Sequence, residues 1–108
     1  MSEIWEDFIS NLRDNTGQMP KTEIINLVKD LSSDTDAFLK KQGEKLALYL
    51  NQLAEGKITP EQLEGYVKDI NTLIKIQALK MGVKTKARAR KFIRGITTLI
   101  LKELLTKI

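Results

Sequence analysis

Apolar residues recur three and four positions apart along almost the whole 108-residue chain, and strand-like alternation is nearly absent. The two prolines are Pro20 and Pro60, and the β-branched residues are interleaved with leucine, lysine, glutamate and alanine at helical spacing. The pattern therefore predicts an all-α fold. At this length the chain is expected to form one domain over residues 1–108, with a small core of its own.

The first predicted helix covers residues 2–14. Ser2 suits its N-cap, and the Asn-Thr-Gly segment at 15–17 suits its end. Trp5 with Phe8 could anchor a ligand, but at helical spacing with other apolar residues a place in the core is preferred. The apolar face of this helix consists of Ile4, Trp5, Phe8, Ile9 and Leu12.

A second helical stretch begins near Pro20 and meets a Ser-Ser-Asp-Thr-Asp segment at 32–36, whose residues favour caps and turns. A break here, with Ser33 or Asp34 capping a new helix, is one interpretation. The other is a single helix over residues 22–54, because an apolar stripe stays roughly in phase across the segment. A break or kink is preferred. The stripe consists of Ile24, Val28, Leu31, Phe38, Leu46, Tyr49 and Leu53.

The strongest local signal is a short connection with its tip at residues 56–59. Gly56 can take the left-handed conformation that ends a helix. Thr59, Pro60 and Gln62 then suit the N-cap, the first position and the capping box of the next helix. A connection this short makes the flanking helices antiparallel neighbours. We therefore expect a small helical bundle built on a long antiparallel hairpin, with the N-terminal helix packed across it.

The helical pattern continues from Pro60 to Ile108, and Gly82 is the candidate break within it. Gly65 and Gly95 fall inside the predicted helices, where each costs about 1 kcal/mol relative to alanine. Close helix–helix approach is the simplest reason for both.

The apolar residues at the C-terminal end occupy much more than one narrow stripe of a helix. Some of this surface is expected to need a second chain, so the sequence predicts a homo-oligomer, most simply a dimer. The residues concerned are Ile96, Leu99, Ile100, Leu101, Leu104, Leu105 and Ile108.

Charge is divided between the two ends of the chain. Residues 1–69 carry 13 acidic and 8 basic side chains, whereas residues 70–108 carry 1 acidic and 10 basic. The net charge of +4 hides this division, and no carboxylate stands between Asp69 and Glu103. Such an asymmetry indicates either a partner of opposite sign or neutralisation of one half by the other.

Seven cations crowd together in the last third of the chain. On a continuous helix, at about 100° per residue, they share one side, and Phe92, Ile93 and Ile96 fall on the opposite side. Val83 falls on the basic side. The seven candidates for contact with phosphate groups or with a partner are Lys80, Lys84, Lys86, Arg88, Arg90, Lys91 and Arg94.

This basic face has three possible roles. It can be neutralised by the acidic N-terminal third, within the chain or across an oligomer, or by an acidic protein surface. It can follow the phosphates of a nucleic acid, although no aromatic side chain interleaves the cations. The basic amphipathic segment 91–108 can also lie on a membrane surface, although the core needs its apolar face.

The composition removes most catalytic chemistry. The chain has no cysteine and no histidine, so thiolate and imidazole nucleophile–base pairs and the metal sites built from them are impossible. The carboxylate pairs Glu61/Glu64 and Asp34/Asp36 stand at helix starts, where capping and the helix dipole explain them. No enzyme activity, cofactor or metal site is expected.

The sequence gives no sign of a targeting or membrane-spanning segment. The acidic N-terminus is unlike the basic start of a signal peptide. The charge-free stretch at 95–101 has seven residues, against about 20 for a membrane-spanning helix. A cytoplasmic location without a transmembrane segment is expected.

Three short motifs are similar to a pattern in small bacterial and prophage-type helical proteins of unassigned function. They are LAEGKITPE at 53–61, ALKMG at 78–82 and KFIRG at 91–95. The resemblance implies a helical accessory or assembly protein, and it implies no activity and no functional residues. We therefore expect a non-catalytic interaction or assembly module. The alternative is an accessory nucleic-acid-binding protein that contacts phosphates through residues 80–94.

Overall fold

The computed structural model describes residues 4–14 and 17–108, and within these it contains five α-helices, a π-helical segment and no strand. The all-α prediction is confirmed. Ser2, Asn15 and Thr16, which were assigned to the ends of the first helix, lie outside the described residues. The elements are α1 (Ile4–Ser10), α2 (Lys21–Ser32), α3 (Ala37–Ala54), α4 (Pro60–Ala78), α5 (Val83–Gly95) and the π-helix η1 (Ile96–Leu104).

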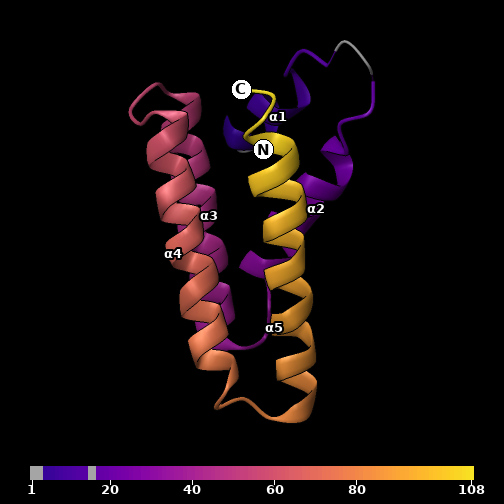
Figure 1. Ribbon diagram of the computed structural model, residues 1–108, viewed down its shortest axis with the longest axis vertical. Coiled ribbons are helices and arrows are strands. Elements are labelled where there is room, and N and C mark those ends of the chain that lie inside the picture. The colour runs from indigo at the N-terminus through magenta and orange to yellow at the C-terminus, as the bar shows by residue number, and fades with distance from the viewer. Residues whose placement is uncertain (1–3, 15–16) are drawn as a thin grey trace.

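The helices form a bundle around one core. Packing contacts join α2 to α3, α3 to α4, and α4 to the continuous rod of α5 and η1. Contacts between α2 and that rod close the bundle, and α1 packs against α2 and α3. Figure 1 shows α3, α4 and α5 running along the long axis of the molecule, which measures 41 × 28 × 27 Å.

Apolar side chains from every element meet in the core. Trp5 is buried as predicted, and its backbone amide donates a hydrogen bond of 2.9 Å to Asn51 Oδ1, which ties α1 to α3. In the last segment Ile96, Ile100 and Leu104 are fully buried. Much of the wide apolar surface that motivated the dimer prediction is therefore covered within one chain.

Both candidate breaks in the helical pattern are turns in the structure. α2 ends at Ser32, and the hydroxyl of Ser33 donates to the Lys29 carbonyl at 2.7 Å. The cap of α3 is Asp36, whose carboxylate accepts from the Leu39 amide at 3.0 Å. The preferred break is thus confirmed, but the prediction that Ser33 or Asp34 caps the new helix is wrong.

The connection from α3 to α4 follows the predicted capping chemistry. Gly56 has a positive φ of 74°. The Thr59 hydroxyl accepts from the Gln62 amide at 3.1 Å, and the Gln62 side chain accepts from the Thr59 amide at 2.9 Å. α4 accordingly begins at Pro60.

The prediction that the first helix extends to Asp14 is wrong, because α1 ends at Ser10. The ammonium of Lys21 donates to the carbonyls of Ser10 and Leu12 at 3.1 and 2.6 Å. A cation at the end of a helix satisfies its last carbonyls and stabilises the negative end of the dipole. The side chain that caps the C-terminal end of α1 therefore comes from the first residue of α2.

Glycines allow two close helix contacts. A Cβ on Gly43 would overlap the backbone of Ser32, where α2 crosses α3, and a Cβ on Gly95 would lie 2.7 Å from Leu27 Cδ1. Close approach therefore accounts for Gly95. It does not account for Gly65, which has open space around it.

Candidate functional site

The candidate site is built on α5 and the turn before it. Six of the seven predicted cations lie on α5, whereas Lys80 lies in the turn between Ala78 and Val83. The prediction that Lys80 shares the helix face is therefore wrong, because Gly82 interrupts the helix and stands at the N-cap of α5. Ala89 and Phe92, on the opposite side of α5, are buried in the core.

The cations of α5 differ in exposure. Lys86 and Arg88, at the two ends of the arc of cations around α5, are half-buried, and the other four are exposed. The exposed four are Lys84, Arg90, Lys91 and Arg94.

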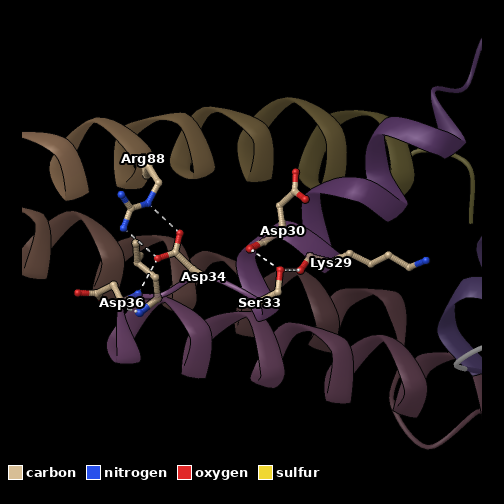
Figure 2. Close-up of polar contacts among 7 residues, drawn as sticks. Lys29, Asp30, Ser33, Asp34, Asp36 and Arg88 are labelled. Carbon is tan, nitrogen blue, oxygen red and sulfur yellow. Dashed lines mark hydrogen bonds and ion pairs between the residues drawn. The ribbon is translucent and has the colours of Figure 1, made fainter.

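Arg88 is held by a carboxylate from the break between α2 and α3. Its Nε donates to Asp34 Oδ2 at 3.0 Å and its Nη2 donates to Asp34 Oδ1 at 3.2 Å. Oδ1 also accepts from the Asp36 amide at 2.8 Å. Figure 2 shows both oxygens of Asp34 engaged in this way. A bidentate guanidinium–carboxylate pair fixes orientation as well as charge.

The environment of Asp34 favours its ionised form. Its side chain is only 4% exposed, and this burial by itself raises the carboxyl pKa. The hydrogen bond from Arg88, the amide of Asp36 and the positive charge of Arg88 outweigh burial, so the pKa of Asp34 lies below its usual value. Asp34 therefore compensates the charge of Arg88 and fixes its orientation, while the Arg88 side chain stays 41% exposed.

The other cations of the predicted set have no such neighbour. Within residues 4–14 and 17–108, no carboxylate lies at ion-pair distance from their side chains. The acidic N-terminal third thus neutralises one cation of this set and leaves six uncompensated. We call five of these the basic side of α5: Lys84, Lys86, Arg90, Lys91 and Arg94.

A groove of about 610 Å³ runs beside the basic side, between α4 and α5. Lys86, Arg90 and Arg94 line one wall, and Lys75 of α4 joins them. Lys75 is not among the seven cations predicted from the sequence, although it stands in the carboxylate-free stretch after Asp69. The apolar lining of this α4–α5 groove consists of Ala78, Leu79, Ala87 and Ile93.

A second groove, of about 500 Å³, lies on the other side of α5, against α2. Its lining includes the apolar side chains of Leu27, Phe92 and Leu99 and a mixture of charged ones, namely Glu23, Asp30, Asp34, Arg88 and Lys91. In Figure 2 the Asp30 side chain points from α2 toward the α5–η1 rod. α5 is therefore flanked by a cationic groove on one side and by a groove of mixed charge on the other.

A further polar pair joins α4 to η1. Asn71 Nδ2 donates to Thr97 Oγ1 at 3.1 Å and so joins α4 to η1 inside the core. Among the described residues, no three acidic side chains gather as metal ligands would. None of the described helices is both long and apolar enough to cross a bilayer.

Comparisons with protein-family models, with curated proteins and with solved structures found no match. The resemblance to prophage-type helical proteins accordingly stays a prediction, and the functional argument depends on the geometry of the α5 region.

Proposed function

We propose that this chain is a non-catalytic interaction module that binds an acidic surface of a partner protein through the basic side of α5 and the α4–α5 groove. The observation that supports this most directly is the group of uncompensated cations beside a groove that is partly lined by apolar side chains. A partner that presents carboxylates around a few apolar side chains complements both features.

The arrangement of these cations is unfavourable for the helix that bears them. Lys86, Arg90 and Arg94 follow one another at intervals of four residues, the spacing at which like charges repel on a helix. α5 has no acidic residue in its first turn, so Lys84 and Lys86 stand at the positive end of the dipole without compensation. Local conflicts of this kind are typical of functional sites, because a bound anion relieves them.

The groove favours a protein over a nucleic acid as the partner. Phosphates would satisfy the cations but would leave Ala87 and Ile93 uncovered. Phe92, the aromatic residue of α5, is buried in the core, and stacking on bases needs an exposed ring. Nucleic-acid binding is therefore the alternative outcome of the same experiment.

The proposal keeps three further predictions from the sequence. We propose that α3 and α4 form an antiparallel hairpin that supports α5, that the protein is a homodimer, and that it acts in the cytoplasm. Light scattering at tens of micromolar tests the dimer, and a monomer at that concentration would remove it.

The binding experiment compares two labelled probes by fluorescence anisotropy: an amphipathic peptide of glutamate and leucine, and duplex DNA. Each probe is titrated with the protein at low and at physiological salt. We expect peptide binding that weakens as salt rises, because counterions compete for the cations.

Charge reversal locates the binding surface. Arg90→Glu/Arg94→Glu should weaken peptide binding at least tenfold. The matched control, Lys40→Glu/Lys41→Glu, makes the same change in net charge at two exposed positions of α3 and should leave binding near the wild-type level. Tighter binding of DNA than of the peptide would favour the alternative function. Equal losses in both variants, or no binding at low salt, would refute the proposal.

A further inference from the structure

The most exposed large apolar side chains of the described residues are Val83 and Leu79, at 88% and 79%. Leu79 begins the connection between α4 and α5 and Val83 is the first residue of α5, with the half-buried Met81 between them. We call residues 79–84 the α4–α5 tip. Apolar side chains so exposed contribute little to the stability of the fold, so their clustering at one turn indicates contact with something outside the chain.

The tip protrudes from the bundle. In Figure 1 it forms the lower end of the molecule, and the connection between α2 and α3 does not reach as far along the long axis. A flat surface that approached this end of the molecule would therefore meet the α4–α5 tip first.

Cations surround the apolar residues of the tip. Lys80 and Lys84 belong to it and are exposed, and Lys75 and Lys86 stand within about one turn of it on α4 and α5. Asp36 is the acidic residue nearby, in a shallow hollow with Lys80 and Met81. Its side chain is already used to cap α3. The charge presented at this end is therefore positive.

We propose that the α4–α5 tip docks the protein end-on to a lipid bilayer rich in anionic headgroups. Leu79 and Val83 would enter the boundary between headgroups and acyl chains, and Lys80 and Lys84 would lie among the headgroup charges. Shallow apolar insertion combined with attraction of lysines to anionic lipids is how peripheral proteins bind membranes.

The dimensions of the tip fit this arrangement. At 1.5 Å rise per residue, Arg90 lies about 9 Å along α5 from Lys84. That distance is close to the Debye length of about 8 Å at physiological salt, so attraction to an anionic surface reaches the middle of α5. The C-terminal segment 91–108, in contrast, is not the membrane-binding element, because its residues Ile96 and Ile100 are buried in the core.

The lipid surface and the acidic partner proposed above use adjoining surfaces, because Leu79 also lines the α4–α5 groove and Lys84 belongs to both the tip and the basic side of α5. Val83 does not line the α4–α5 groove, so its substitution can separate the two activities. Failure of one proposal would thus leave the other intact.

Cosedimentation with vesicles tests the inference directly. Vesicles of phosphatidylcholine with phosphatidylglycerol should bind the wild-type protein, and vesicles of phosphatidylcholine alone should bind it at least tenfold more weakly. Leu79→Ser/Val83→Ser should reduce binding to the anionic vesicles at least tenfold. The control Leu48→Ser changes a leucine of α3 that is 52% exposed, and it should bind like the wild type.

Two further measurements keep the test decisive. When anionic vesicles are added, the tryptophan emission of Val83→Trp should shift to shorter wavelength and should be quenched by brominated lipid. The emission of the wild type, which comes from the buried Trp5, should change in neither way. Val83→Ser should weaken vesicle binding and leave the affinity for the acidic peptide unchanged.

Absence of wild-type binding to anionic vesicles at low salt would overturn the inference. Vesicle binding that does not depend on Val83 and Leu79 would also overturn it, because cations alone would then suffice. A parallel loss of peptide binding in Val83→Ser would instead assign the tip to a protein partner.

Discussion

Gly43 stands where α3 crosses the end of α2, and its replacement by alanine makes a sharp test of the packing. The added Cβ would overlap the backbone nitrogen and Cα of Ser32 and would lie 2.5 Å from the carbonyl carbon of Leu31. All three are backbone atoms, so no change of rotamer can make room. The two helices must instead separate by about 1 Å to reach ordinary contact.

The overlap lowers the free energy of unfolding, and the higher helix preference of alanine relative to glycine offsets part of that loss. Overpacking of a well-packed contact costs typically about 1–3 kcal/mol, and more where the backbone itself must move. Replacing a glycine inside a helix by alanine returns about 1 kcal/mol. The free energy of unfolding of Gly43→Ala should therefore fall by about 2 kcal/mol. In a protein of this size the melting temperature should fall by about 10 °C.

Gly65→Ala is the matched control, because Gly65 also lies inside a helix but nothing stands within 4 Å of its added Cβ. This variant should gain about 1 kcal/mol through the same helix preference. Urea unfolding followed by far-UV circular dichroism measures both variants, and equal m-values show that the exposed surface on unfolding is comparable. A Gly43→Ala protein as stable as the wild type, or shifted like Gly65→Ala, would refute the close approach of α2 and α3.

Three further outcomes are expected. Gly95→Ala should destabilise less than Gly43→Ala, because the nearest atom is Cδ1 of Leu27, the end of a flexible side chain; thermal unfolding compares the two. Gly56→Ala should cost about 1–2 kcal/mol in urea unfolding, because an L-residue is strained at a φ of 74°. The folded-state pKa of Asp34 is lowered, so its contribution to stability is fully present above about pH 4 and lost as pH falls through that lowered value. Asp34→Asn should therefore unfold more easily at neutral pH, and its deficit relative to the wild type should shrink in acid; a deficit that stays constant with pH would contradict this.

Some structural features of this protein depend on interactions between residues close in the sequence, and these could be predicted from the sequence. Helical periodicity depends on which neighbours three and four positions away are apolar, so the all-α fold was predicted without knowledge of the packing. The start of α4 was equally accessible, because Thr59, Pro60 and Gln62 satisfy the first amides of the helix among themselves. The break after Ser32 was recognised for the same reason.

Other features depend on residues that only folding brings together. The first helix ends at Ser10, and the ammonium of Lys21 from α2 donates to the carbonyls of Ser10 and Leu12 there, a contact that the local sequence does not predict. The pair of Asp34 with Arg88 joins positions 54 residues apart. It compensates one of the six cations of α5, and the sequence alone could not say which one.

The sequence by itself determined the helical periods and the start of α4, because these are relations between residues close along the chain, and the division of charge, which is a matter of composition. Only the tertiary structure decided which charges are neutralised, that Lys75 joins the cations of α5, and that Leu79 and Val83 stand exposed at one end of the bundle. These are relations between separate helices. They depend on how the helices pack around a shared core, and the spacing of residues within one helix does not specify that packing.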